Sequence, residues 1–493
     1  MKGIMIQGTS SDAGKSYIAT ALCRIFANKG YKVSPFKSQN MSNNSYVTFD
    51  GKEIGRAQGV QAEAAKSEAN VHMNPILLKP MKDTLSEVVL HGEVFNKYTG
   101  MGYRKEFTLT KGLEAVKESL HYLDKNYDMV VIEGAGSPAE VNLNDREIVN
   151  MRIAEAADVD VLLVTNIDLG GSFASLVGTL ELVAEHRDRI KGVIFNKFRG
   201  DIRLLQDGLD WFEEYTGVKV AGVIPYMTDV YIETEDAQSK HLLYNFETDN
   251  ALDIAVIHME RVSNNTDLEP FIHEKDVSIR IVKKASEFGN PHAVIIPGTK
   301  STIGDLEYLN EAKLSDKIKN YYNNGGTVFG ICGGYQVLGE EILDPKRVDS
   351  KNKSECKGIG LLPIKTTFED KKNVKNVTGE VVNSFSKMKV SGYEIHLGET
   401  EYLNDVLPFV KLENSKFDGC VVDGGRLIGT YLHNIFHNDN FRNEWLNKVR
   451  VKNGFETFEV VDTSKIKEES YEKLAKVVEE HLDMKLIESM VFE

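Results

Sequence analysis

Short apolar runs alternate with longer stretches of helical periodicity, and this alternation most constrains how the chain can fold. In the first 235 residues the runs are GIMIQG, YKVSPFK, YDMVVIEG, ADVDVLLVTNID, IKGVIFNKF and VAGVIPY. Runs of this kind are typical of strands buried on both faces, and the segments between them are long enough to form helices. We therefore expect an α/β fold in which helices cover a parallel sheet.

A second α/β pattern follows, with the runs LDIAVIHM, VSIRIVK, PHAVIIPGTK, GGTVFGICGG, GIGLLPIKTTF and RLIGTYLHNIF. Residues 236–250 are polar and lack a clear period, which predicts a linker. The end of the chain looks helical and charged. The 493 residues are thus expected to form a domain at 1–235, the linker, a domain at 251–445 and a helical appendage at 446–493.

The net charge of -15 argues against a protein that binds nucleic acid or an anionic membrane. The four cysteines form no C-x-x-C motif, which favours a reducing cytoplasm over a disulfide framework. No apolar stretch approaches the roughly 18 residues of a membrane span. The opening residues MKGIMIQGTSS enter a strand at once, so we expect no cleaved leader. The sequence leaves open whether the protein forms a homo-oligomer.

The segment GTSSDAGKS, from Gly8 to Ser16, follows the first strand and opens a helix. A glycine-rich loop at this position lets backbone N–H groups surround phosphate oxygens. Lys15 is expected to contact the β- and γ-phosphates, and the Ser16 hydroxyl to bind Mg²⁺. We expect the nucleotide to be bound by these residues together with Gly8, Thr9, Asp12, Ala13 and Gly14. The alternative is a glycine turn without function.

The spacing of this loop is unusual, because five residues separate Gly8 from Gly14 where the common P-loop has four. It resembles the dethiobiotin-synthetase-like branch of P-loop proteins. Partition-type ATPases carry a second lysine at the position that Ser10 occupies here.

Three residues beyond the loop suit nucleotide chemistry. Glu133 ends an apolar strand, where a carboxylate can hold Mg²⁺ beside the phosphates. Lys37, after the second strand, could neutralise a phosphoryl group during transfer. Asn196 ends a later strand, where its amide could contact the purine edge. The alternatives are a solvated acid at the strand end for Glu133 and an ordinary polar residue for Asn196.

Two polar loops are candidate substrate sites. The stretch Gln39–Ser45 is rich in Asn and Ser, and we expect Gln39, Asn40 and Ser42 to contact the substrate. Residues 136–151 form a second such loop near Glu133, with Glu140, Asn142 and Asp145. An ordinary surface turn is the alternative for the first of these loops.

The stretch TVFGICGGYQVLGEE predicts a nucleophile elbow at Cys332, because a strand leads into Gly-x-Cys-Gly-Gly and a helix follows. A helix N-terminus favours a thiolate, and the N–H groups that follow the cysteine can bind an oxyanion. A second donor could come from Pro297–Thr299, where another strand ends. His433 is the expected base, although His437 and His396 compete for that role. A structural thiol is the alternative for Cys332, and we expect Cys23, Cys356 and Cys420 to be structural.

Taken in order along nearly the whole chain, GTSSDAGKS, FKSQNMSNNS, EGAGSPAEVNL, PGTKSTIGDL, GICGGYQVLG, GYEIHLGET and YLHNIF resemble the cobyric acid synthase family. The resemblance implies an N-terminal dethiobiotin-synthetase-like ATP-binding domain and a C-terminal class I-type glutamine amidotransferase domain. It also implies Cys332 as nucleophile and His433 as base. Gly298 and Gly333 would supply oxyanion N–H groups, and Gln336 would line the glutamine pocket.

The activity that the resemblance implies is the amidation of adenosylcobyrinic acid a,c-diamide at its b, d, e and g carboxylates. This ligase would use Mg²⁺, ATP and glutamine. The sequence leaves two alternatives: the sibling enzyme that amidates the a and c carboxylates of cobyrinic acid, and a P-loop switch protein with a non-catalytic amidotransferase domain. Many amidotransferases have a glutamate two residues after the histidine, where this chain has Ile435. The group that orients His433 is therefore unassigned.

Overall fold

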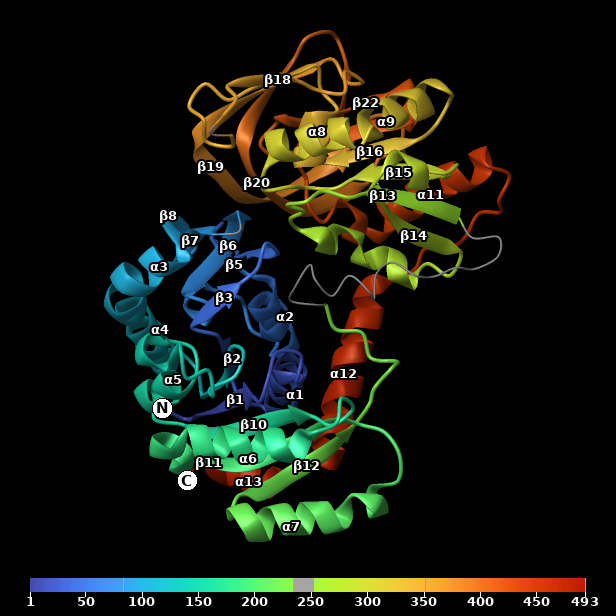
Figure 1. The fold of residues 1–493 in the computed structure, drawn as a ribbon. Coiled ribbons are helices and arrows are strands. Elements are labelled where there is room, and N and C mark those ends of the chain that lie inside the picture. Colours follow the sequence, from blue (N-terminus) through green and yellow to red (C-terminus); the bar gives the residue numbers. More distant parts are fainter. Residues whose placement is uncertain (83, 234–251, 351, 493) are drawn as a thin grey trace. The chain divides into compact units, whose positions relative to one another are not determined.

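The computed structural model describes residues 1–82, 84–233, 252–350 and 352–492 (Figure 1). The predicted linker at 236–250 lies outside the described residues. The described chain divides into two compact units. Unit 1 contains residues 1–42, 52–233 and 464–492, and unit 2 contains residues 43–51 and 252–463. Unit 2 thus includes nine residues of the predicted first domain, and unit 1 includes most of the predicted appendage.

Unit 1 is built on a parallel sheet in the order β12-β11-β10-β1-β9-β2. Its strands are the six apolar runs of the N-terminal half, and most of their side chains are buried because helices cover both faces. The bounds are β1 Gly3–Gly8, β2 Val33–Phe36, β9 Met129–Glu133, β10 Asp160–Asn166, β11 Ile190–Phe198 and β12 Lys219–Pro225.

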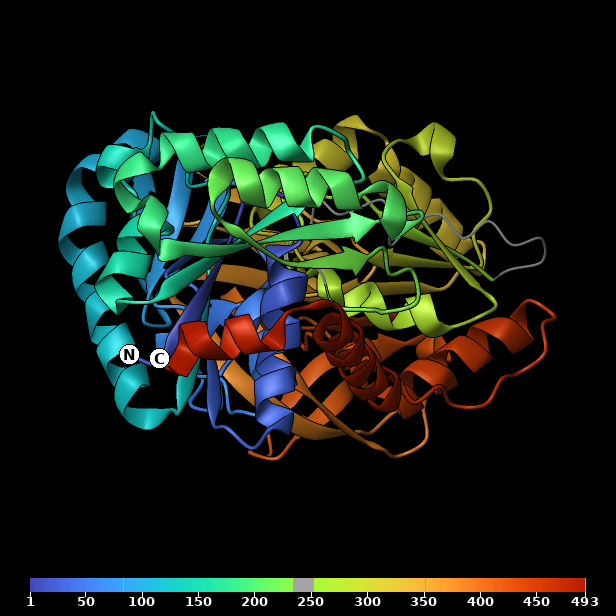
Figure 2. The ribbon, with the colours of Figure 1, turned by 90° about the horizontal axis from the view of Figure 1, so that it is seen from below.

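The helices of unit 1 include two from the C-terminal end of the chain. Figure 2 shows α13 running beside the start of the chain, and α13 contacts β1. Residues of α12 and α13 share one apolar core with α1 and β1. The bounds are α1 Lys15–Asn28, α2 Arg56–Ala64, α3 Gly100–Gly102, α4 Leu113–Asn126, α5 Met151–Ala157, α6 Ser172–Leu182, α7 Gln206–Thr216, α12 Thr463–His481 and α13 Met484–Phe492.

A smaller sheet of unit 1 has the order β3-β6-β7-β8, with β3 parallel to β6 and the other pairs antiparallel. The predicted substrate stretch begins in its edge strand. The bounds are β3 Gln39–Met41, β6 Ile76–Lys82, β7 Leu85–Leu90 and β8 Glu93–Thr99; β5 spans Glu53–Gly55. Short 3-10 helices η1 (Val71–Met73), η3 (Asn144–Arg146), η4 (Ala184–Arg189) and η5 (Ile202–Leu204), and the π-helix η2 (Tyr103–Gly112), complete the unit.

Unit 2 contains a mixed sheet whose strands follow the order β14-β13-β15-β16-β23-β22-β21-β19-β17-β18, with β20 paired to β19. The neighbouring strands β14, β13, β15, β16 and β23 are parallel. The sheet continues through β22, β21, β19 and β20 as antiparallel pairs. The bounds are β13 Leu252–Ile257, β14 Val277–Val282, β15 Ala293–Ile296, β16 Val328–Ile331, β17 Glu341–Leu343, β18 Glu355–Lys357, β19 Ile364–Val381, β20 Lys389–Tyr402, β21 Leu407–Leu412, β22 Phe417–Val422 and β23 Leu427–Thr430.

The helices of unit 2 pack a separate apolar core around this sheet. They are α8 Thr302–Glu311, α9 Leu314–Asn323, α10 Gly333–Val337 and α11 Asp439–Lys452, with the 3-10 helices η6 Asn265–His273, η7 Ala285–Glu287, η8 Asp423–Gly425 and η9 Ile435–His437. The strand β4, Ser45–Val47, also belongs to this unit. The predicted α/β fold is confirmed in both units, and the parallel strands end where the predicted nucleophile and base occur.

Candidate active site

Cys332 lies on a sharp turn between β16 and α10, as the elbow prediction requires. Its backbone has φ 50° and ψ −108°, a conformation that L-residues with side chains rarely adopt. A Cβ at Gly333 would lie 2.6 Å from Thr299 Cγ2, and one at Gly334 would lie 2.0 Å from the Ile296 carbonyl oxygen. The two glycines therefore allow the turn to pack closely against the end of β15.

His433 follows β23 and is fully buried beside the elbow. Its Nδ1 lies 2.7 Å from Asp267 Oδ2, and Asp267 Oδ1 accepts a hydrogen bond of 2.7 Å from the Asn434 N–H. Asp267 belongs to η6 and is itself buried. One carboxylate thus fixes both the imidazole ring and the backbone that carries it, which makes Asp267 the candidate for the orienting group that the sequence left unassigned.

The electrostatics favour a protonated imidazole next to the sulfur. Burial opposes the charge on His433, but the Asp267 carboxylate and the Cys332 sulfur raise the pKa of His433 to about 10. A protonated histidine can stabilise a neighbouring thiolate, which is the nucleophilic form of cysteine. Cys332, His433 and Asp267 thus have the arrangement expected of a nucleophile, a base and an orienting carboxylate, and their catalytic roles stay a prediction.

Sequence reasoning missed Asp267 because it precedes His433 by 166 residues, and no spacing rule connects them. The local sequence SNNTDLEP carries no catalytic pattern. The usual glutamate position is taken by Ile435, which lies in the apolar core with no exposed surface. The competing histidines are engaged elsewhere: His437 Nε2 lies 2.8 Å from the Thr266 carbonyl, and His396 Nδ1 lies 2.7 Å from the Gly398 carbonyl.

The other residues predicted for glutamine chemistry surround this group. A Cβ at Gly298 would lie 3.0 Å from His433 Cε1, so Gly298 borders the imidazole directly. Gln336 is buried, and its amide is held at both ends: Thr302 Oγ1 donates to its oxygen at 2.9 Å, and its nitrogen donates to Tyr431 Oη at 3.1 Å. Gln336 lies near the elbow, but its amide already has protein partners.

The loop after β1, which the sequence predicts to bind phosphate, folds back on the Lys15 side chain. Gly14 has φ 101°. Lys15 Nζ donates to the carbonyls of Ser10 and Gly136, each at 3.0 Å. Thr9 Oγ1 bonds Thr165 Oγ1 at 3.1 Å, and Asp12 is a left-handed residue of the same loop.

Asn196 supports this loop in the present structure. Its Nδ2 donates to the Ala13 carbonyl at 2.9 Å, and a Cβ on Gly14 would lie 1.9 Å from that nitrogen. The amide of Asn196, near the end of β11, therefore packs directly against the loop. Gly8 ends β1 beneath it, where a Cβ would lie 3.0 Å from Lys15 Nζ. The contact of Asn196 with a purine stays a prediction.

Glu133 is the centre of a buried polar cluster at the end of β9. Ser16 Oγ donates to its Oε1 at 2.8 Å, Lys37 Nζ contacts the same oxygen at 3.1 Å, and Gln61 Nε2 donates to Oε2 at 2.5 Å. Burial alone would raise the pKa of Glu133, but Lys37, Ser16 and Gln61 hold it below its ordinary value. Sequence reasoning missed Gln61, which lies in the helical stretch RAQGVQAEA without a distinguishing motif.

The predicted substrate residues are distributed between buried and exposed positions. Gln39 Oε1 accepts from Tyr103 Oη at 2.5 Å, Asn40 Nδ2 donates to Gln58 Oε1 at 3.1 Å, and the Ser42 N–H donates to the Leu78 carbonyl at 3.0 Å.

The second predicted substrate loop lies on the surface. The carbonyl of Asn142 accepts from Arg104 at 2.9 Å, and Asp145 forms an ion pair with the same guanidinium. Glu140 is exposed, and its carbonyl accepts from the Leu143 N–H at 2.8 Å. The role of this loop stays a prediction.

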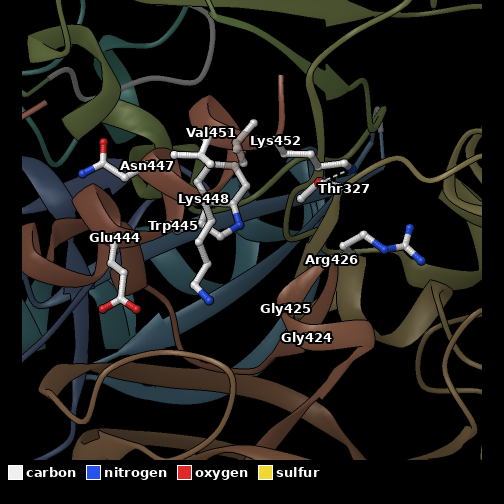
Figure 3. Close-up of a pocket in the computed structure, with 11 residues that line it drawn as sticks. Thr327, Gly424, Gly425, Arg426, Glu444, Trp445, Asn447, Lys448, Val451 and Lys452 are labelled. Carbon is white, nitrogen blue, oxygen red and sulfur yellow. Dashed lines mark hydrogen bonds between the residues drawn. The ribbon is translucent and has the colours of Figure 1, made fainter. Parts of the chain in front are cut away.

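The group formed by Cys332, His433 and Asp267 lies at the carboxyl end of β16. A cavity of about 490 Å³ lies at the other end of this strand, and it shares no lining residue with the group (Figure 3). Its wall is formed by Thr327, Gly424, Gly425, Arg426, Glu444, Trp445, Asn447, Lys448, Val449, Val451 and Lys452. The other cysteines lie outside the group, and burial raises the pKa of Cys420 to about 12 and that of Cys356 to about 11.

Two family models match the chain. Residues 4–240 match the CobQ/CobB/MinD/ParA nucleotide binding domain, and residues 253–441 match the CobB/CobQ-like glutamine amidotransferase domain. A nucleotide-binding domain joined to a glutamine amidotransferase domain defines an amidating ligase, which is the class of enzyme that the sequence predicted.

The relatives specify the family within this class. A cobyric acid synthase of Anoxybacillus flavithermus is 50% identical over 99% of this chain and 97% of its own length. One from Geobacillus is 48% identical over the same shares, and one from Clostridium botulinum is 46% identical over 100% of this chain and 99% of its own length. The chain belongs to the cobyric acid synthase family. The resemblance noted in the sequence is thereby confirmed.

Proposed function

We propose that the protein uses ATP and glutamine to amidate the b, d, e and g carboxylates of adenosylcobyrinic acid a,c-diamide, giving adenosylcobyric acid in cobalamin biosynthesis. Membership of the family supports the choice of substrate. The observation that carries the mechanism is the hydrogen-bonded series Asp267–His433 beside Cys332, because it supplies a nucleophile with a tuned base. A reducing cytoplasm, which keeps this thiol free, is the expected location.

The thiol group releases ammonia from glutamine. Cys332 Sγ attacks the carboxamide carbon as a thiolate, and the proton that it gave up resides on His433. His433 then returns this proton to the leaving nitrogen, so that ammonia departs and a thioester remains. Water hydrolyses the thioester to glutamate and regenerates the thiol. Asp267 keeps the proton-bearing Nδ1 oriented throughout.

The P-loop activates the acceptor carboxylate. A carboxylate is a weak electrophile, so ATP transfers its γ-phosphoryl group to a carboxylate oxygen and leaves ADP. Ammonia then attacks the carbonyl carbon of this acyl phosphate, and inorganic phosphate departs. Lys15 and Lys37 are the cations placed to neutralise charge on the transferring group.

The oxygen atoms near the P-loop fit a Mg²⁺ ion that arrives with the nucleotide. Ser16 Oγ and Glu133 Oε1 lie 2.8 Å apart, and both are hard oxygen ligands of the kind that Mg²⁺ prefers. No group of three or more His, Cys, Asp or Glu side chains suited to a metal occurs among the described residues, so the phosphates would complete the ligand set. When bound, Mg²⁺ would neutralise phosphate charge. No helix in the described ranges is long and apolar enough to cross a membrane.

Mass spectrometry of the diamide after incubation with ATP, Mg²⁺ and glutamine tests the proposal. We expect stepwise gains of amide groups at the b, d, e and g carboxylates. Amidation of cobyrinic acid at the a and c positions instead would contradict the substrate assignment.

Replacement of the nucleophile separates the two chemistries. Cys332→Ala should abolish amidation with glutamine and preserve amidation with added ammonium salt, because the thiol and the P-loop belong to different units. Cys356→Ala, which removes a partly exposed thiol outside the group, is the matched control and should keep both activities. Loss of both activities in a folded Cys332→Ala protein would reject the division of labour.

A further inference from the structure

Residues 43–51, which we call the inserted segment, belong to unit 2, although the chain on both sides of them belongs to unit 1. Their contacts within unit 2 are specific. The Ser45 N–H donates to Asn264 Oδ1 at 3.0 Å, and the Asn264 N–H donates to the Asn43 carbonyl at 3.4 Å. Asn376 Nδ2 donates to the Thr48 carbonyl at 2.7 Å. The segment is therefore held by hydrogen bonds at several points along its length.

The same segment touches the surroundings of both catalytic residues. Val47 packs in a small apolar cluster with Tyr393 and Ile395. The Tyr393 ring stacks on His433, with 5.2 Å between centroids and 18° between planes. The Ile395 carbonyl accepts from Cys332 Sγ at 3.5 Å. Val47 thus borders the two residues that contact the base and the nucleophile.

Asn264 makes the most direct connection, because its Nδ2 lies 3.4 Å from His433 Nε2. The orientation of this amide follows from its neighbours. The Ser45 backbone N–H can only donate, so the Asn264 atom that faces it is the oxygen. The NH₂ group therefore faces His433. Asn264 is buried, and its hydrogen bond to the Ser45 N–H holds the amide in this orientation.

An NH₂ group facing Nε2 favours one protonation state of the imidazole. His433 Nδ1 donates to Asp267, so Nε2 is the nitrogen that exchanges a proton with Cys332. The Asn264 NH₂ can donate to Nε2 only while Nε2 lacks a proton. Among titratable groups, Asp267 from η6, Cys332 from the elbow and Tyr393 from β20 face His433, and Asp267 and Cys332 favour the protonated form. Asn264 instead favours the imidazole without a proton on Nε2.

We propose that Asn264 is a positioning residue that restrains proton transfer from Cys332 to His433, and that the inserted segment sets its orientation. Glutamine hydrolysis then responds to the stretch Gln39–Ser42, which leads directly into the segment. The inference rests on the proposed glutaminase function. Movement of Ser45 would free the Asn264 amide to turn its oxygen towards Nε2, where it would accept a hydrogen bond from the imidazolium.

The test is the pH dependence of Cys332 alkylation by iodoacetamide in the full-length protein, followed by mass spectrometry of the Cys332 peptide. Asn264→Ala removes the donor, so the thiolate–imidazolium pair should form at lower pH. We expect alkylation on the acid side of the profile to become about two- to tenfold faster, the effect of one net hydrogen bond. An unchanged acid limb, or a shift to higher pH, would overturn the restraining role.

Two substitutions at one position test the inserted segment. Ser45→Pro removes the backbone N–H that orients Asn264 and should reproduce the alkylation profile of Asn264→Ala. Ser45→Ala retains that N–H and should keep the wild-type profile. A wild-type profile in Ser45→Pro would overturn the contribution of the segment.

Glutamine hydrolysis provides the final readout. In the wild-type protein, ATP with the diamide should accelerate hydrolysis, whereas Asn264→Ala should hydrolyse glutamine faster without them and respond less to them. An equal response in both proteins would overturn the link to Gln39–Ser42. Cys332→Ala separates failure of the proposed function from failure of the role of Asn264. If Cys332→Ala still hydrolyses glutamine, the proposed function fails; if it does not, an unchanged Asn264→Ala protein rejects the role of Asn264 alone.

Discussion

Replacing Asp267 by asparagine removes the negative charge beside His433 while almost preserving its shape. The carboxylate lies 2.7 Å from His433 Nδ1, and both side chains are buried, so the pair is shielded from water. An asparagine could still accept from the Asn434 N–H through its oxygen. It would then present an NH₂ group to Nδ1, which must become an acceptor, and the imidazole would carry its proton on Nε2, the nitrogen that has to receive the proton from Cys332.

The magnitude follows from the kind of contact that is lost. A hydrogen bond to a charged group contributes about 1.5–3 kcal/mol, which corresponds to roughly a 10- to 150-fold loss of glutaminase rate. The incorrect tautomer adds to this loss, since the same exchange in a serine protease triad costs about 10⁴-fold. We therefore expect Asp267→Asn to retain a tenth of the activity at most.

The pH profile of glutaminase activity should show in which direction the pKa of His433 moves. Asp267 is a principal cause of the raised pKa of His433, about 10, so its loss lowers that pKa. The alkaline limb of the glutaminase profile should move to lower pH, because the imidazolium loses its proton earlier. The active pH range therefore becomes shorter at its alkaline end.

Glutamate release across the pH range measures the alkaline limb, and ammonia-dependent amidation serves as the internal control for folding. Asp344→Asn is a matched control, since Asp344 is another buried carboxylate of unit 2, hydrogen-bonded to the Val348 N–H at 2.8 Å. Wild-type glutaminase activity with an unchanged alkaline limb in Asp267→Asn would refute the orienting role.

Three further changes have expected outcomes. Lys15→Ala should abolish amidation from glutamine or ammonia while glutamine hydrolysis persists, and full ammonia-dependent amidation would contradict the P-loop role. In Gly333→Ala the new Cβ would lie 2.6 Å from Thr299 Cγ2, so glutaminase activity should fall at least about tenfold with ammonia-dependent amidation kept. Burial and the nearby Glu394 raise the pKa of Asp418 to about 6. The stability from its protonation is full below its unfolded pKa and is lost as pH rises through about 6, so Asp418→Asn should flatten the dependence of Tm on pH between about 4 and 7. An unflattened Tm profile would count against this assignment.

The parallel strands were predictable from the sequence because their signal is local. Each strand of the unit 1 sheet is a continuous apolar run, and burial on both faces demands such a run. The strands β20, β21 and β22 lacked this signal because they mix buried and exposed positions. The sequence did not predict β8 of the small sheet for a similar reason, since every position described in this strand is exposed or half-buried.

The candidate site was predictable where one motif contains the chemistry. Cys332 and Lys15 each occur in a loop whose glycine spacing has a geometric cause. Asp267 and Gln61 act through contacts between distant parts of the sequence, and no short pattern marks them. The placement of residues 43–51 in unit 2 also depends on tertiary contacts, because neither their composition nor their period differs from that of an ordinary polar loop.

The return of the chain to unit 1 at residue 464 has a consequence for synthesis on the ribosome. The apolar core around Ile4, Ile18 and Leu22 also contains Leu474 and Ile487, near the C-terminal end. This core cannot close until Ile487 has been translated, whereas every described residue of unit 2 has by then been available for folding. The nucleotide-binding half is therefore expected to mature last, and an incomplete chain should expose the apolar surface by which quality-control systems recognise it.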